Sequence, residues 1–257
     1  MIYAVGMKYT ANMNSKNANI NRSTQTYLDS SYEKYSSYER FKFVRQIMQK
    51  HINHTSSFLD IGCAKGEFIW YLKDYFHNVE FTGIDISQKL LSIAKRQQKL
   101  ESVDFIKADA AGFSLNKRFD CVYMGGVLSI FDDFKKPMQC ALKHIKPGGR
   151  GYIFGCFNKE DIDVIVRYRN NYAGSKKWES GLNIFSINSI RAALKPFVLS
   201  LRFHFFKIST DLPRQKDPVT SYTLNTSEKG RIIANGANII TDFYLVEFKK
   251  RINKCVE

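Results

Sequence analysis

The chain has 257 residues, of which 44% are hydrophobic and 25% are charged, as expected of a folded globular domain with a substantial core. This composition excludes a mainly disordered chain and a collagen-like or repeat protein, and no run approaches the roughly 18 apolar residues of a membrane helix. The 39 Lys and Arg residues against 24 Asp and Glu give a net charge of +15, which favours an anionic partner such as nucleic acid, a phosphorylated metabolite or an acidic membrane.

The five cysteines occur singly, without a CxxC pair, and the N-terminus has no charged region followed by an apolar one. An odd number of scattered cysteines fits reduced thiols better than a disulfide framework. We therefore expect a cytoplasmic protein without a secretory signal or a membrane span.

Residues 1–35 are rich in Asn, Ser, Thr and Tyr and show no sustained period, which predicts an N-terminal extension or flap. The remainder, residues 36–257, is expected to form a single domain that opens with a helix over 36–53. Strand and helix signals then alternate, which predicts βαβ units and a doubly wound, parallel α/β sheet. The expected strands are 57–61, 79–84, 103–107, 119–124 and 151–157, and the expected helices run from the glycine-rich turn to Phe76, over 88–97 and over 134–144.

Beyond the fifth strand the pattern changes. We expect one helix near 161–170 and another over 187–194. Two strand-like runs, 198–209 and 239–249, follow without a helix between them, although a polar stretch over 210–237 separates them. These two runs predict an antiparallel hairpin at the edge of the sheet.

A glycine-containing turn between the first strand and the next helix is the most informative segment. Asp60 lies two residues before Gly62, and Gly66 follows four residues after it. In nucleotide-binding βα units, glycines at this turn let the backbone approach a ligand at the helix N-terminus. Ala64 stands where a dinucleotide-binding loop has its middle glycine, which argues against a ligand with a pyrophosphate such as NAD.

Two acidic residues follow the next two strands. Asp85 ends the second strand, where a carboxylate can accept hydrogen bonds from both hydroxyls of a ribose. Asp109 follows the third strand and is placed to accept from an exocyclic amine such as adenine N6. The two acids together indicate a nucleoside-like ligand.

With these landmarks, residues 55–158 resemble the class I S-adenosylmethionine-dependent methyltransferases. The resemblance implies a Rossmann-like sheet of seven strands, mostly parallel with an antiparallel last strand. It implies S-adenosylmethionine as methyl donor, S-adenosylhomocysteine as product, and a cofactor site made of Asp60, Gly62, Cys63, Ala64, Gly66, Asp85, Ile86, Asp109, Ala110 and Gly125. The alternatives are a Rossmann domain for NAD and a methyltransferase-like fold that has lost its cofactor.

Methyl transfer needs an aligned nucleophile, exclusion of water and, for an alcohol, removal of a proton, so the reaction requires no signature catalytic residue. The fourth strand ends in Tyr123-Met124-Gly125-Gly126 and lacks the Asn/Asp/Ser-Pro-Pro-aromatic motif of many nucleobase amino methyltransferases. Many members of the small-molecule branch have a histidine where Ser129 stands. The candidate catalytic residues are His204, Tyr123 and Ser129, and no metal site is indicated.

In this family the insertion after the fifth strand and the final hairpin cover the acceptor, so we expect substrate-lid insertions at about 159–196 and 210–237. Arginines and aromatic residues there suit a phosphate or carboxylate together with a ring. The candidate substrate-binding residues are Arg167, Arg169, Tyr172, Trp178, Asn183 and Arg214. Four residues near the N-terminus are candidates to close over the carboxylate of the cofactor, namely Tyr32, Tyr35, Tyr38 and Arg40.

The favoured function is methylation of an oxygen of a polar, anionic small molecule. Asp211–Arg214, Ser221–Thr223 and Asn235-Gly236 loosely resemble methyltransferases of surface-polysaccharide pathways, which implies a sugar, nucleotide sugar or similar precursor as acceptor. An RNA methyltransferase is the alternative that the net charge favours, although the sequence has no RNA-binding module or RNP-type aromatic motif. The third alternative is a non-catalytic protein that keeps the cofactor as a structural or regulatory ligand.

Overall fold

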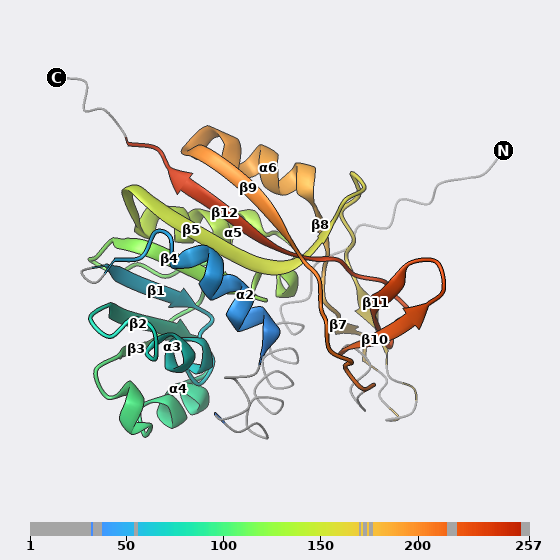
Figure 1. The fold of residues 1–257 in the computed structure, drawn as a ribbon, viewed down its shortest axis with the longest axis horizontal. Helices are drawn as coiled ribbons and strands as arrows, with labels where there is room; N and C mark the ends of the chain where they lie inside the picture. Colours follow the sequence, from blue (N-terminus) through green and yellow to red (C-terminus); the bar gives the residue numbers. More distant parts are fainter. Residues whose placement is uncertain are drawn as a thin grey trace.

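The computed structural model describes residues 32, 38–53, 56–169, 171, 174, 177–214 and 220–252. Its main sheet has the strand order β3-β2-β1-β4-β5-β12-β9, with β8 paired to β5 off this path (Figure 1). The strands of this sheet are β1 (Ser57–Ile61), β2 (Glu80–Asp85), β3 (Asp104–Lys107), β4 (Phe119–Gly125), β5 (Ile145–Asn158), β8 (Phe185–Ser186), β9 (Val198–Phe206) and β12 (Phe243–Lys250).

Strands β1 to β5 are parallel, and β12 runs antiparallel to both of its neighbours, β5 and β9. Strand β1 is buried at all five positions because it lies inside a sheet that is covered on both faces. The predicted α/β sheet, seven strands along its main path with an antiparallel last strand, is confirmed.

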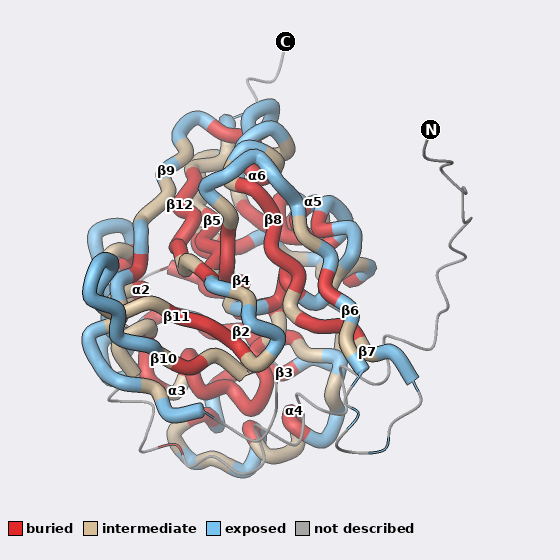
Figure 2. The backbone as a smooth tube through the Cα atoms, turned by 90° about the vertical axis from the view of Figure 1, so that its right-hand side faces the viewer, coloured by how far each residue is buried: buried red, intermediate tan, exposed pale blue. Residues whose placement is uncertain are grey.

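Helices cover both faces of the sheet, and the buried strands lie between them (Figure 2). The helices are α2 (Glu39–Met48), α3 (Glu67–Leu72), α4 (Gln88–Ala94), α5 (Lys135–His144) and α6 (Ile187–Leu194), with short 3-10 helices at Gln98–Leu100, Leu128–Ile130 and Lys195–Phe197. Val44, Leu72 and Leu91 bring α2, α3 and α4 into one core cluster, whereas Met138 and Leu194 bring α5 and α6 into the other. Within the described parts of the chain, no helix is long and apolar enough to span a membrane.

The prediction of a helix near 161–170 is wrong. Val164 and Val166 are β-branched and stand two residues apart, a pattern that suits an extended chain better than a helix. Val164 forms an isolated antiparallel bridge with Ile184. The segment continues into a small separate sheet, in which β6 (Arg167–Tyr168) pairs with β7 (Glu179–Ser180).

The polar stretch between β9 and β12 also has regular structure. Strands β10 (Ser221–Thr226) and β11 (Gly230–Asn235) pair as an antiparallel hairpin that the sequence did not predict. In Figure 1 this hairpin and β7 lie at the right, on the side toward which β1 and β5 run. Both small sheets therefore stand at the carboxyl end of the main sheet, where ligands bind in open α/β folds. Residues 1–31 and 33–35 of the predicted extension lie outside the described residues.

Candidate active site

The turn between β1 and α3 is held tightly against the end of β2. Gly62 and Ala64 have left-handed backbones, with φ of 74° and 52°. A Cβ atom at Gly62 would stand 2.4 Å from Cγ2 of Val127, so this position has no room for a side chain. The N–H groups of Gly62 and Cys63 both donate to the carbonyl oxygen of Ile84, at 2.8 and 2.9 Å. The loop is thus fixed before any ligand arrives.

Asp85 lies at the end of β2, directly beside this loop. One carboxylate oxygen accepts the N–H of Ala64 at 2.9 Å and the other accepts the N–H of Ser87 at 2.8 Å. Burial raises the pKa of Asp85, and the bonds from Ser87, Ala64 and Ile86 oppose that rise. Each oxygen keeps a further lone pair, so this oriented carboxylate can still accept from the hydroxyls of a ribose.

Asp60 is 3% exposed, and no hydrogen-bond donor among the described residues reaches its carboxylate. Burial, followed by the charges of Glu67 and Asp85, raises the pKa of Asp60 well above its ordinary value. Three carboxyl groups therefore surround the loop, and one of them lacks a hydrogen-bonding partner within the described chain. S-adenosylmethionine carries an ammonium and a sulfonium, so this acidic environment fits that cofactor.

The remaining predicted cofactor residues lie at neighbouring strand ends. The N–H of Ala108 donates to the carbonyl of Asp85 at 3.0 Å, which joins the end of β3 to the end of β2. Asp109 and Ile86 are exposed there, and one Asp109 oxygen accepts the N–H of Ala111 at 2.9 Å. Gly125 ends β4, and Ala110, partly exposed, follows Asp109. The sheet thus brings the predicted cofactor residues to one edge, although no ligand contact is seen for any of them.

One N-terminal candidate contacts the glycine loop, and another lies on α2. The Tyr32 hydroxyl donates to the carbonyl of Lys65 in the glycine loop at 2.5 Å, so Tyr32 contacts the loop itself. Arg40 lies over the rings of Tyr38 and Phe41, and its buried Nε has no hydrogen-bonding partner among the described residues. An unsatisfied guanidinium nitrogen fits a carboxylate that is still to bind. Tyr35 lies outside the described residues.

The three candidate catalytic residues do not come together. The Tyr123 ring packs 4.4 Å from that of Phe68, and its hydroxyl lies over Gly125, where a Cβ atom would be 2.4 Å away. The Ser129 hydroxyl donates to the carbonyl of Gly126 at 3.1 Å. His204 lies on β9, three strand spacings from β4, which is about 14 Å.

His204 bonds Glu247 through Nε2 at 2.8 Å, so its ring is held at the edge of the sheet. This position does not support the hypothesis that His204 is the base that acts beside Gly125. Of the three candidates, the Tyr123 hydroxyl is the group placed at the end of β4.

Asn183 is fully buried and has a structural role in place of the predicted contact with substrate. Its side-chain oxygen accepts the N–H of Val166 at 2.9 Å, and its amide nitrogen donates to the carbonyl of Phe131 at 2.9 Å and to Asp132 at 3.1 Å. Its backbone N–H donates to the carbonyl of Ser129 at 2.7 Å. These bonds fasten the insertion after β5 to the loop that follows β4.

The predicted arginines are divided between paired and exposed positions. Arg167 forms an ion pair with Asp132, which adds to the bonds of Asn183 between the insertion and the loop after β4. Arg169 lies 5.5 Å over the exposed ring of Trp178, and Arg214 lies 5.4 Å over the ring of Tyr222. Tyr172 lies outside the described residues. Across the segments that the structure describes, no three His, Cys, Asp or Glu side chains group as metal ligands.

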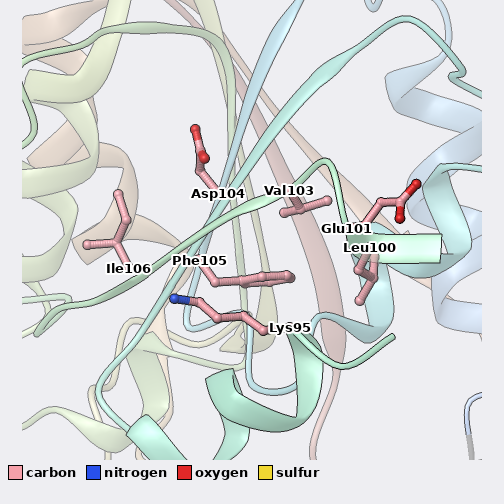
Figure 3. A pocket seen from close by; sticks show the side chains of 7 residues that line it. All are labelled: Lys95, Leu100, Glu101, Val103, Asp104, Phe105 and Ile106. Carbon is pink, nitrogen blue, oxygen red and sulfur yellow. The ribbon is translucent and has the colours of Figure 1, made fainter. Parts of the chain in front are cut away.

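A hollow of about 340 Å³ lies behind the glycine loop, at the β3 edge of the sheet (Figure 3). Phe105 and Leu100 line it together with the stem of Lys95. The Phe105 ring also packs under Gly66 and Gly83, where an added Cβ would approach within 2.9 Å of it. This hollow therefore lies beneath the loop and is separate from the edge that Asp85 and Gly125 share.

Comparison with known proteins agrees with this geometry. Residues 59–150 match the family model described as a methyltransferase domain, and this range contains the glycine loop, Asp85, Asp109 and the end of β4. The matched segment is therefore similar to a methyltransferase domain, in line with the resemblance to the class I S-adenosylmethionine-dependent methyltransferases.

Individual relatives of this methyltransferase domain are distant. A malonyl-[acyl-carrier protein] O-methyltransferase from Priestia megaterium is 22% identical over 172 residues, which cover 65% of this chain and 62% of that protein. The chain therefore spans less than two thirds of the length of this relative. The solved DhpI complex with S-adenosylhomocysteine superposes with a TM-score of 0.59 at 13% identity, covering 93% of this chain and 96% of the other.

The [4+2]-cyclase SpnF superposes almost as well, with a TM-score of 0.54 at 15% identity over 83% of this chain and 81% of the other. Similarities at this level of identity show the fold alone. Because a cyclase has the same fold, the activity has to be argued from the site.

Proposed function

We propose that the protein transfers a methyl group from S-adenosylmethionine to an oxygen of a polar, anionic small molecule. The observation that carries the proposal is the Asp85 carboxylate, which is oriented by the Ala64 N–H of the glycine loop at 2.9 Å and lies within the segment that matches the methyltransferase model. The cofactor supplies a methyl group already activated on sulfur, so the protein needs to bind, align and exclude water.

The cofactor would be held from three directions. Asp85 would accept the ribose hydroxyls, and Asp109 with Ile86 would border the adenine. Asp60, which has no donor within the described chain, would accept from the ammonium group. The unsatisfied Nε of Arg40 supports a place for the carboxylate on the α2 side.

The acceptor would lie between the end of β4 and the two small sheets, which we propose to be the lid over 159–196 and 210–237. An oxygen acceptor agrees with the relative from Priestia megaterium, which is an O-methyltransferase. Arg169 and Arg214 support an anionic acceptor, because neither has an ion-pair partner among the described residues. A sugar, nucleotide sugar or similar precursor of a surface polysaccharide is the finer proposal, and only the sequence of the 211–236 region supports it.

The proposal is tested first by calorimetric titration with S-adenosylhomocysteine. We expect Asp85→Ala to weaken binding at least about tenfold, since a charged hydrogen-bonding group is lost. Gly62→Arg should abolish binding, because the new side chain meets Val127. Asp104→Ala, an exposed aspartate on β3, is the matched control and should bind as the wild type does. Equal affinity in all four proteins would refute the site.

The acceptor class is tested by transfer of a labelled methyl group from S-adenosylmethionine into a cell extract that is fractionated by size. Label in small molecules or saccharides that is indifferent to nuclease supports the proposal. Nuclease-sensitive label in large species would replace it with RNA methylation. Tight binding of S-adenosylhomocysteine without any transfer to the extract would indicate the non-catalytic alternative.

A further inference from the structure

A polar hollow of about 520 Å³ lies at the end of the sheet opposite to the glycine loop. Its wall comes from the loop after α2, the start of β4, the turn that opens β5 and the last residues of β12. In Figure 1 these segments lie at the left, where β1 begins and β12 ends. The proposed methyltransferase site does not account for this hollow.

The hollow brings two positive charges face to face. Arg150 on β5 and Lys249 on β12 are direct partners across the antiparallel pair, so their side chains share one face of the sheet. Like charges placed opposite each other in a sheet are destabilising. Destabilising placements of this kind are expected at functional positions, where binding of a ligand compensates for the lost stability.

The nearby carboxylate Glu247 pairs with one member of this pair only, Arg150. Glu247 is 5% exposed, receives Arg150 at 2.7 Å, and also faces Arg202 across the β12–β9 pair. Among the described residues, no carboxylate pairs with Lys249. Burial, followed by the charge of Arg150, lowers the pKa of His51, although Glu247 lies 3.2 Å from its ring.

Among the described residues that line the hollow, Asp120 is the one carboxylate, and it already has partners. Asp120 accepts the N–H and the hydroxyl of Ser57, at 2.8 and 2.7 Å, and the ammonium of Lys146 at 2.8 Å. Although burial acts to raise it, these bonds hold the pKa of Asp120 below its ordinary value. Asp120 is therefore an ionised carboxylate that already pairs with Lys146. Lys249 and the outer part of Arg150 remain available to a ligand.

We propose that this hollow binds a small phosphate-bearing molecule through Arg150 and Lys249. A phosphate between the two side chains would relieve their repulsion and form charge-assisted hydrogen bonds with both. The volume is within the range of small-molecule sites and admits a phosphorylated metabolite.

The test is calorimetric titration of the full-length chain with inorganic pyrophosphate at fixed ionic strength. The wild type is expected to bind one equivalent in a saturable manner. Lys249→Glu should weaken this binding at least about tenfold, since an attraction becomes a repulsion. Lys229→Glu makes the same charge change in the exposed turn between β10 and β11, and it should leave the binding unchanged.

Binding of S-adenosylhomocysteine by Lys249→Glu is the readout for an intact fold and should equal that of the wild type, which separates this test from that of the methyltransferase site. Equal weakening by both lysine variants would mean diffuse attraction to a basic surface and would overturn the proposal. Absence of saturable binding to the wild type would overturn it as well. So would binding of a short single-stranded RNA but not of pyrophosphate.

Discussion

Asp60 is the residue whose position is hardest to explain without a ligand. A carboxyl group that is 3% exposed and has no donor within the described chain destabilises the ligand-free protein when it is ionised. Its raised pKa means that the folded state binds the proton more tightly than the unfolded state does. The contribution of Asp60 to stability therefore falls as pH rises above the ordinary range of an aspartate.

Asp60→Asn should remove this pH-dependent loss. We expect the ligand-free variant to melt above the wild type at pH 7.5, by about 2–4 °C for each kcal/mol recovered, and the difference to shrink toward pH 4. The same change should weaken binding of S-adenosylhomocysteine by about tenfold, because the acceptor for its ammonium is lost. Melting curves across pH and a titration measure the two effects. Asp104→Asn is the exposed control, and a variant less stable than the wild type at pH 7.5 would contradict the argument.

At the scale of elements, one amide joins the insertion after β5 to the loop after β4 through several hydrogen bonds, beside the ion pair between Arg167 and Asp132. Asn183 contributes its backbone N–H and three side-chain hydrogen bonds, which join Val166 and the 127–133 loop. This loop also covers Gly62 through Val127. The insertion and the glycine loop therefore contact the same short segment. We expect a substitution in the insertion to affect the packing of the glycine loop.

Asn183→Ala leaves the N–H of Val166 and the carbonyl of Phe131 without their partner inside the protein. We expect a loss of about 2–3 kcal/mol in the free energy of unfolding. If Asn183 only positions the lid, KM for the acceptor should rise while the affinity for S-adenosylhomocysteine stays within about twofold. Denaturant unfolding and steady-state kinetics measure the effects. Asn188→Ala, on the exposed side of α6, is the control, and equal effects of both substitutions would refute this role.

The sequence predicted those elements whose formation depends on residues close together in the chain. The glycine turn, the acid that ends β2 and the period of α2 and α6 require only a few neighbouring residues, so these parts of the fold were predictable from sequence, and the cofactor contacts stay a prediction. The β-branched Val164 and Val166 favour an extended chain, but the partner that Val164 pairs with, Ile184, lies 20 positions further along and could not be assigned from local pattern. The burial of Asn183 and the pairing of His204 with Glu247 depend on contacts across 52 and 43 positions, which no local pattern contains.

At the scale of the whole molecule, the charge of +15 bears on the choice of acceptor. Lys and Arg are spread along the chain, and several that the structure describes are already paired, including Lys99, Lys117 and Lys146. A dispersed basic surface attracts any polyanion and selects none.

Bulk RNA should therefore bind at low salt and be released by a moderate rise in salt. We expect affinity to fall by more than about a hundredfold between 50 and 200 mM salt, with the same slope for structured and single-stranded RNA. Filter binding over a salt series measures the slope. An RNA that stays bound at 200 mM salt, and whose binding changes when S-adenosylhomocysteine is added, would instead favour RNA as the acceptor.

The position of β12 has a consequence for how the protein is made. This strand, residues 243–250, follows every other described strand of the sheet in sequence, yet it lies between β5 and β9. On a ribosome, the glycine loop and β1 to β5 emerge long before the strand that joins β9 to them. A nascent chain that stops short of residue 243 therefore exposes two strand edges at once, so the interval before β12 is synthesised is when it is most open to aggregation or to a chaperone.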